Sequence, residues 1–137
     1  MMNPISADIG QILIDGGVGT GGVNIFAGPE QESDEVTVSI IETGGDANPK
    51  WLRDDTQIQT RIRGLRNNYH SALSKAQEVK DTLLGVYPLE IGGTHYVRFI
   101  IQSDIAYIGQ DENQRPLLTI NWIVTREYDS GGNRTPL

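Results

Sequence analysis

The segment DTQIQTRIRGLRNNYHSALSKAQEVKDTLL, residues 55–84, contains one change in the spacing of its apolar residues. Up to Gly64, apolar and polar side chains alternate with the two-residue period of a β-strand. Beyond Gly64 the apolar residues recur every three or four positions, as in an amphipathic α-helix. Gly85 and Pro88 end that pattern. The segment therefore predicts a strand over residues 55–64 that leads directly into a long helix over residues 66–84.

The alternating strand has two chemically different faces. Ile58, Thr60 and Ile62 point to one side and are expected to face the core. The opposite face is polar and consists of Gln57, Gln59, Arg61 and Arg63. Such a face is either solvated and salt-bridged within the chain or in contact with a partner, and both interpretations stay open.

The rest of the chain adds elements on both sides of this segment. Residues 4–15 predict a short amphipathic helix with Ser6 or Asp8 as its N-terminal cap. Further strands are predicted over residues 23–28, 35–42, 94–109 and 115–127. The last two strands enclose a short polar loop and predict an antiparallel hairpin. Residues 43–49 predict a loop.

Together these elements predict a single α+β domain over residues 1–137 with a mostly antiparallel sheet. We expect the short N-terminal helix and the long helix to pack on one face of that sheet. The core is assigned to residues 23–128. Residues 129–137 show no periodicity and are expected to form a flexible tail.

Composition narrows the classes of function. The chain has no cysteine, which excludes disulfides, thiolate metal sites and cysteine nucleophiles. No apolar run approaches the roughly 20 residues of a transmembrane helix. The N-terminal residues lack the basic start and apolar centre of a signal peptide. We therefore expect a soluble protein that is not secreted and has no membrane partner.

Charge is distributed unevenly along the chain. The net charge of −7 arises within residues 1–50, whereas the charges of residues 51–137 sum to zero. One acidic segment stands out and contains Glu30, Glu32, Asp34 and Glu35. An acidic chain gains nothing from the release of phosphate counterions, so tight binding to nucleic acid is not expected.

The glycine-rich stretch GGVGTGG, residues 16–22, contains the G-x-G-x-x-G spacing of dinucleotide-binding loops. In such loops a strand precedes the glycines and a helix follows, because the helix N-terminus holds the pyrophosphate. Here a helix precedes them and a strand follows, so we expect no cofactor. The glycines are instead predicted to form a hinge between the N-terminal helix and the sheet. This hinge consists of Gly16, Gly17, Gly19, Gly21 and Gly22.

The sequence contains no catalytic pattern. Neither His70 nor His95 lies in a metal-ligand spacing. Two pairs of adjacent carboxylates, Asp54–Asp55 and Asp111–Glu112, are expected in solvated loops rather than opposed in a pocket. We therefore expect neither a metal site nor enzyme activity.

The order of elements and three segments resemble the tail terminator proteins of long-tailed bacteriophages, also known as minor capsid or tail completion proteins. The first segment is NIFAGPEQESDEVTVSIIETGG, in which an acidic turn precedes a strand and a glycine loop. The second is IQTRIRG followed by NNYHSALSKAQEVKDTLL, where Tyr69 and Ala72 follow the strand. The third is the hairpin YVRFIIQSDIAYIGQDENQRPLLTINWIVTRE. Together they extend over roughly residues 5–128.

The resemblance implies a structural function in the virion. Members form a ring, typically a hexamer, on the last ring of the tail tube. That ring stops tube polymerisation and offers a docking surface to the head connector, while DNA passes through its lumen. The implied partners are further copies of the chain, the tail tube protein and a head-completion or connector protein, assembled in the host cytoplasm. The alternatives are a head-completion or stopper protein of the phage neck, a small nucleotide-binding enzyme domain, and an adaptor domain outside virions.

Within this interpretation, several surfaces are predicted to make contacts. The polar strand face is expected to meet the acidic segment of a neighbouring copy across a heterologous ring interface. The loop Gln110–Arg115, with Asp111 and Glu112 at its tip, is expected to reach the lumen or the tail tube. Trp51 lies in a charged loop, where it is either an interface anchor or folded back onto the domain. The glycine hinge would let the N-terminal helix reposition during assembly.

Overall fold

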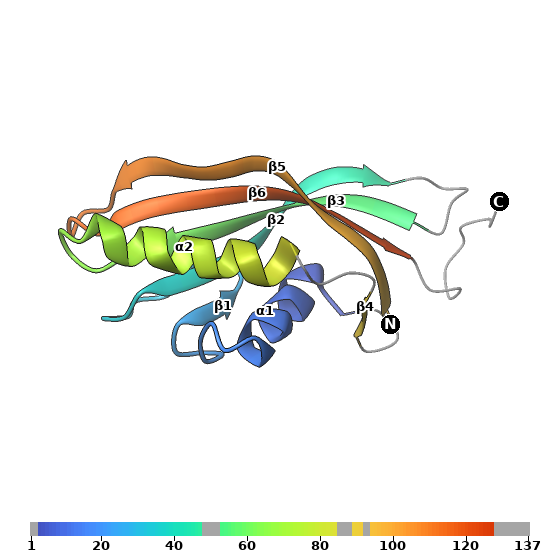
Figure 1. Cartoon of the computed structure of the whole chain (residues 1–137), viewed down its shortest axis with the longest axis horizontal. Coiled ribbons are helices and arrows are strands. Elements are labelled where there is room, and N and C mark those ends of the chain that lie inside the picture. Colours follow the sequence, from blue (N-terminus) through green and yellow to red (C-terminus); the bar gives the residue numbers. More distant parts are fainter. Residues whose placement is uncertain (1–2, 48–52, 85–88, 92–93, 128–137) are drawn as a thin grey trace.

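The computed structural model of the chain describes residues 3–47, 53–84, 89–91 and 94–127. Its elements follow in the order α1 (Ile5–Asp15), β1 (Ile25–Ala27), β2 (Thr37–Ala47), β3 (Arg53–Arg63), α2 (Tyr69–Leu84), β4 (Leu89–Ile91), β5 (Thr94–Gln110) and β6 (Pro116–Glu127). The strands form one sheet in the order β1-β2-β3-β6-β5-β4 (Figure 1). The pair β1–β2 is parallel and the other pairs are antiparallel, in agreement with the predicted α+β class.

The strand β6 follows the other strands in the sequence but lies in the middle of the sheet. After β3 the chain leaves the sheet through α2 and returns at the far edge as β4 and β5. It then turns back through the predicted hairpin, which is confirmed by the antiparallel pairing of β5 with β6. The resulting β3–β6 ladder is continuous from Arg53 opposite Glu127 to Arg63 opposite Leu117.

One face of the sheet is apolar and joins both helices in a single core. The register places Val38, Ile62 and Leu118 in one row across β2, β3 and β6, and each is at most 1% exposed. The helices add their buried residues to the same cluster, namely Ile5, Ile9, Ile12, Leu13, Ala72, Ala76, Val79 and Leu83. Full burial of one aliphatic side chain stabilises a fold by roughly 1.5–3 kcal/mol. This layer therefore holds α1 and α2 against the sheet.

The junction between β3 and α2 is tighter than predicted. Asn67 adopts a positive φ of 54°, and the Asn68 side chain accepts a hydrogen bond from the Ser71 amide at 3.1 Å. An asparagine at this place caps a helix N-terminus, so α2 begins at Tyr69 rather than at residue 66. A Cβ at Gly64 would lie 2.9 Å from Ala72 Cβ, which explains why glycine is needed where the strand meets the helix.

Two predicted strand boundaries are corrected by the structure. The strand β2 continues to Ala47 through residues predicted as a loop. It does so by means of a bulge between Glu42 and Gly44, followed by positive φ values at Gly44 and Gly45 that glycine tolerates. The short strand β4 was not predicted, because its three residues are too few to show a period.

The predicted cap of α1 is also wrong. The helix begins after Pro4, which makes no side-chain cap, and Ser6 and Asp8 lie inside the helix. Instead, the Ser6 amide donates a hydrogen bond to the Glu42 carboxylate of β2 at 2.8 Å. Asp8 lies inside the fold, where it accepts a hydrogen bond from the Tyr96 hydroxyl of β5. These contacts fix α1 to strands distant in the sequence.

The glycine-rich stretch forms an ordered turn in this structure. Val18 is 4% exposed, and its carbonyl accepts a hydrogen bond from Lys75 of α2 at 2.8 Å. A Cβ at Gly19 would lie 2.9 Å from Ile25 Cγ1, so the turn packs closely against β1. This packing does not favour a freely moving joint, since Val18 would have to leave the core. Movement of α1 at these glycines stays a prediction.

Candidate functional site

The face of the sheet opposite the apolar core is polar along β3, whereas the neighbouring strands add Ile41, Leu117 and Ile123 to it. On β3 this face carries Gln57, Gln59, Arg61 and Arg63, the residues predicted to point away from the core. Gln59 donates a hydrogen bond to Asn121 of β6 at 3.2 Å. Both helices belong to the core on the other side. In the described part of the chain neither helix covers this face, and we call it the open face.

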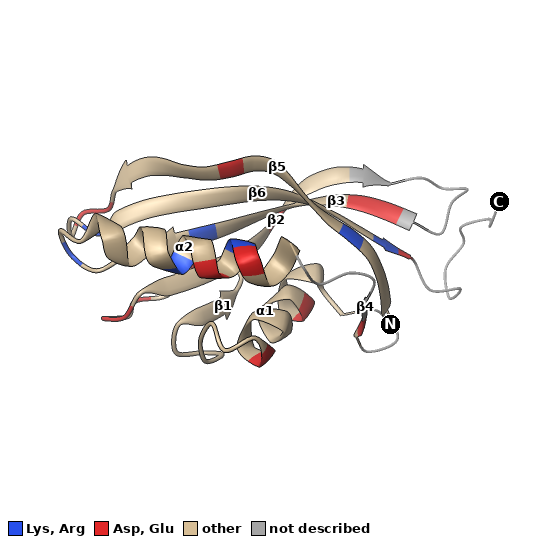
Figure 2. Cartoon of the chain, viewed as in Figure 1, with Lys and Arg blue, Asp and Glu red and all other residues tan. Residues whose placement is uncertain are grey.

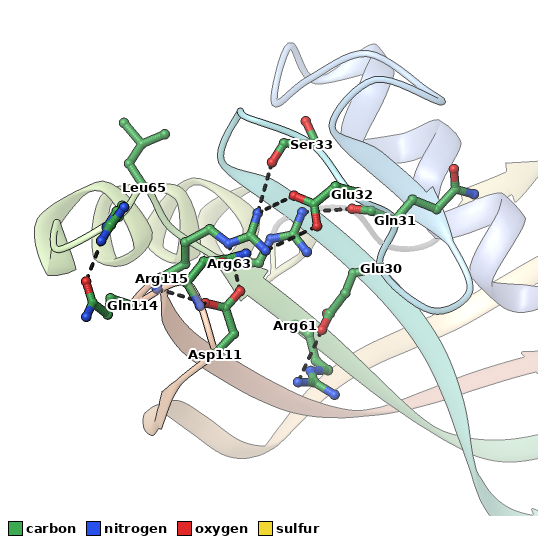
Figure 3. A network of polar contacts seen from close by, with 12 residues as sticks. Glu30, Gln31, Glu32, Ser33, Arg61, Arg63, Leu65, Asp111, Gln114 and Arg115 are labelled. Atoms are coloured by element: carbon green, nitrogen blue, oxygen red, sulfur yellow. Dashed lines mark hydrogen bonds and ion pairs between the residues drawn. The ribbon is translucent and has the colours of Figure 1, made fainter.

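The acidic segment, residues 28–35, folds over one end of the open face. Glu30 lies 3.4 Å from Arg61, and Arg63 donates a hydrogen bond to the Gln31 carbonyl at 2.7 Å (Figure 3). Thr37 and Ser39, which share this face with the two arginines, are fully buried. The acidic segment thus meets the arginines of its own chain.

Arg115 is the centre of this polar network. It follows the β5–β6 loop, and its side chain is 12% exposed. It pairs with Asp111 at 2.7 Å within the loop and with Glu32 at 2.8 Å across 83 residues of sequence (Figure 3). It also donates a hydrogen bond to the Ser33 carbonyl at 3.1 Å. One guanidinium group therefore fastens the acidic segment to the tip of the hairpin.

The charges in the network stabilise one another. The hydrogen bond from Arg115 lowers the pKa of Glu32 below its usual range, assisted by the positive charge of Arg115. Burial alone would raise the pKa of Asp111. Hydrogen bonds from the Arg115 amide and guanidinium and from the Asn113 amide outweigh burial and lower the pKa of Asp111. Both carboxylates are therefore held in the ionised form.

The acidic segment has ion-pair partners within its own chain, and its contact with a neighbouring copy stays a prediction. Glu30 and Glu32, expected to meet a neighbouring copy, pair with Arg61 and Arg115 of the same chain. The folded path of residues 28–35, which periodicity does not reveal, brings the two signs together. Asp111 is not free at a loop tip, since its carboxylate also accepts hydrogen bonds from the Asn113 and Arg115 amides.

The remaining predicted contact residues are not brought into this network. Asp34, Glu35 and Glu112 are exposed, and Gln57 is half-buried on the open face. Trp51 lies outside the described residues. Contacts of these side chains with a partner stay predictions.

A second surface, which the sequence did not single out, is the outer side of β5. This strand pairs with β6 along its length but with β4 only at Thr94–Tyr96. Its residues 97–110 have no outer neighbour in the described part of the chain, and we call them the β5 edge. Ile100, Tyr107 and Ile108 on this edge are 40%, 50% and 52% exposed. In the sequence, the available signal for this surface was the presence of these three large apolar residues on one strand. Their exposure becomes visible in the structure.

The β5 edge carries little charge. Residues 97–110 contain two charged residues, Arg98 and Asp104, whereas α2 beside them carries more charged positions (Figure 2). Its Asp104 is paired with Lys80 of α2 at 2.9 Å, and the bond lowers the pKa of Asp104. An apolar, nearly uncharged edge is a surface suited to contact with another chain.

A hollow of about 180 Å³ lies beside Tyr69, Tyr107 and Gln114, below the size range of typical ligand pockets, roughly 300–1,000 Å³. Within the same residues, no group of three His, Asp or Glu side chains gathers as a metal site would require. None of the described helices is sufficiently long and apolar to cross a membrane.

Comparison with known proteins identifies the family. The family model described as bacteriophage tail terminator protein matches residues 12–128. The chain belongs to this tail terminator family. The resemblance noted in the sequence is thereby confirmed, and the tail terminator has a structural, virion-associated role in the tail.

The tail terminator fold also occurs in a solved structure described as the virion of a native gene transfer agent (GTA) particle. The TM-score is 0.63 at 15% sequence identity, and the match covers 90% of this chain and 94% of that chain. At this identity the likeness concerns the fold alone. No curated protein matches the sequence significantly.

Proposed function

We propose that this chain forms a ring that caps the tail tube and stops its polymerisation. We expect a hexamer, the typical ring of the family that the sequence resembles. The observation that carries the proposal is the match of residues 12–128 to the tail terminator family. The ring also provides the docking surface for the head connector, and DNA passes through its lumen. The net charge of −7 is compatible with that passage, since like charges deny the phosphates any gain from counterion release.

The test is a polymerisation assay with the tail tube protein of the same phage. Tubes are grown with and without the purified chain, and their lengths and ends are measured by negative-stain electron microscopy. We expect shorter tubes with extra density at one end. We also expect mass photometry of the chain, alone or mixed with tubes, to give the mass of a ring. A small acidic protein of unrelated fold serves as the control for nonspecific effects.

Two outcomes contradict the proposal. A chain that stays monomeric and leaves the tube length distribution unchanged is not a terminator. A chain that binds the isolated head connector but not the tube is a stopper or head-completion protein of the neck instead.

A further inference from the structure

Both ends of the sheet have a free stretch of strand edge. At one end, β1 covers β2 only at Val38–Ile40. Residues 41–45 of β2 therefore have no outer neighbour in the described part of the chain, and we call them the β2 edge. At the other end lies the β5 edge. Unpaired edges expose backbone N–H and C=O groups that can accept a strand from another chain.

The two free stretches lie at the same level of the sheet. The registers place Glu42 of β2, Ile58 of β3, Trp122 of β6 and Ile101 of β5 in one row. The same registers set Gly44 level with Ile100. Copies related by rotation about an axis along the strands meet at equal levels. Such copies therefore bring residues 41–45 opposite residues 99–103.

Strand direction favours the same contact. Successive antiparallel pairs make β5 run opposite to β2. A neighbour that keeps its strands along the common axis thus offers β2 antiparallel to β5, which is the more stable form of pairing. Because two different edges meet, the contact is heterologous and continues from copy to copy until a ring closes. A β5–β5 contact would instead end at two copies.

The side chains at the two edges fit this arrangement. Neither edge carries a lysine or a proline, which natural proteins use to protect exposed edges. Ile100 is 40% exposed opposite the glycines of the β2 edge. Tyr107 lies level with Val38, the residue that β1 covers with Ile25, so it would meet β1 of the neighbour. The irregular register of β5 bends the edge, so a strand that shares this curvature fits better than a flat one.

We propose that the β5 edge of each copy pairs antiparallel with the β2 edge of the next, so that the sheet continues from copy to copy around the ring. This inference rests on the proposed ring and names its contact. It replaces the Arg61–Glu30 contact as the main link between copies, because those side chains are already paired within one chain.

The test uses cysteine pairs, because the natural chain contains no cysteine. Thr43→Cys and Gln102→Cys are combined in one chain and treated with a short bifunctional maleimide. Within a chain the two positions are three strand spacings apart, about 14 Å, so a reagent shorter than this links only separate copies. We expect a ladder of products beyond the dimer on a denaturing gel. Its yield should be at least about tenfold above that of Thr43→Cys with Gln110→Cys, because only adjacent thiols have a high effective concentration.

A charge substitution tests the same contact by ring formation. Ile100→Lys is expected to leave a folded monomer, checked by circular dichroism and thermal unfolding, that no longer forms rings. Leu65→Lys is the matched control, because Leu65 has the same 40% exposure but lies outside the sheet edges.

The outcomes separate this inference from the proposed function. Rings that persist in Ile100→Lys while the Thr43/Gln102 pair stays unlinked overturn the edge contact and leave the terminator function intact. Efficient dimers from Gln102→Cys alone also overturn it, because they indicate a two-fold β5–β5 contact. A wild-type chain that forms no ring and caps no tube fails as a terminator, whatever its edges do.

Discussion

Arg115 connects two parts of the molecule that the sequence keeps far apart. Its partners lie on the β5–β6 loop and on the acidic segment, and its side chain is largely shielded from water. Shielded, charge-assisted hydrogen bonds are stronger than ion pairs on an open surface. Together with Arg61 and Arg63, Arg115 therefore sets where the acidic segment lies.

Replacing Arg115 with methionine is expected to lower the free energy of unfolding by about 1–2 kcal/mol. The loss comes mainly from the hydrogen bonds to Asp111 and the Ser33 carbonyl, since Glu32 is mostly exposed. Urea unfolding followed by Trp fluorescence measures the change. Glu112→Gln, in the same loop but exposed, should stay within about 0.5 kcal/mol of the wild type. Equal effects of the two substitutions would contradict the network.

The same network predicts a dependence of stability on pH. The pKa of Asp111 is lowered in the folded state, so its ionised form stabilises the fold above the unfolded pKa, near 4. That contribution is lost as the pH falls through the lower, folded pKa. The difference in unfolding free energy between the wild type and Asp111→Asn should therefore be constant from pH 7 to about 5 and shrink below about 4. A difference that grows on acidification would contradict this sign.

At the scale of elements, local periodicity in the sequence predicted the strands and helices well. The contacts between residues distant in the sequence could not be predicted in this way. Alternation in β3 correctly assigned Ile58 and Ile62 to the core, because a strand has only two faces. The hairpin β5–β6 and the helix α1 followed from equally local patterns. By contrast, the pairing of Asp8 with Tyr96 joins residues 88 positions apart. Charge alone also could not tell whether Glu30 meets an arginine of its own chain or of a neighbour.

The glycine turn after α1 gives a prediction about the motion of that helix. Because Ile9 and Leu13 are fully buried and Val18 is held by Lys75, we expect α1 to stay docked in the isolated chain. Hydrogen exchange should then protect the amides of α1 about as well as those of β3. Exchange in α1 that is much faster than in β3 would support the hinge predicted from the sequence.

The bulge in β2 gives a paired test on adjacent glycines. Gly44 and Gly45 both have positive φ, but a Cβ at Gly44 meets open space, whereas a Cβ at Gly45 would overlap the Asp55 carbonyl oxygen of β3. Gly44→Ala should cost about 1–2 kcal/mol for its backbone conformation. Gly45→Ala should cost more, about 3 kcal/mol or above, because β3 must also move. Thermal unfolding of the two variants measures this order.

At the scale of the whole molecule, the acidic segment weakens the electrostatic attraction between the arginines and a polyanion such as DNA. Glu30 and Glu32 cover Arg61 and Arg115, and the net charge is −7. We expect fluorescence anisotropy to give a Kd for duplex DNA weaker than about 100 μM at physiological salt. The double variant Glu30→Gln with Glu32→Gln removes the two negative charges that are paired with Arg61 and Arg115. This variant should bind duplex DNA measurably at low salt. Tight, salt-independent binding by the wild type would contradict this account.

The central place of β6 has a consequence for synthesis on the ribosome. Leu118, Ile120 and Trp122 of β6 are fully buried, yet the nascent chain delivers them after every other strand. Until they emerge, the facing sides of β3 and β5 have no partner and the core stays open. A product that stops before β6 therefore cannot close its sheet. Only chains translated through residue 127 can complete the six-stranded sheet.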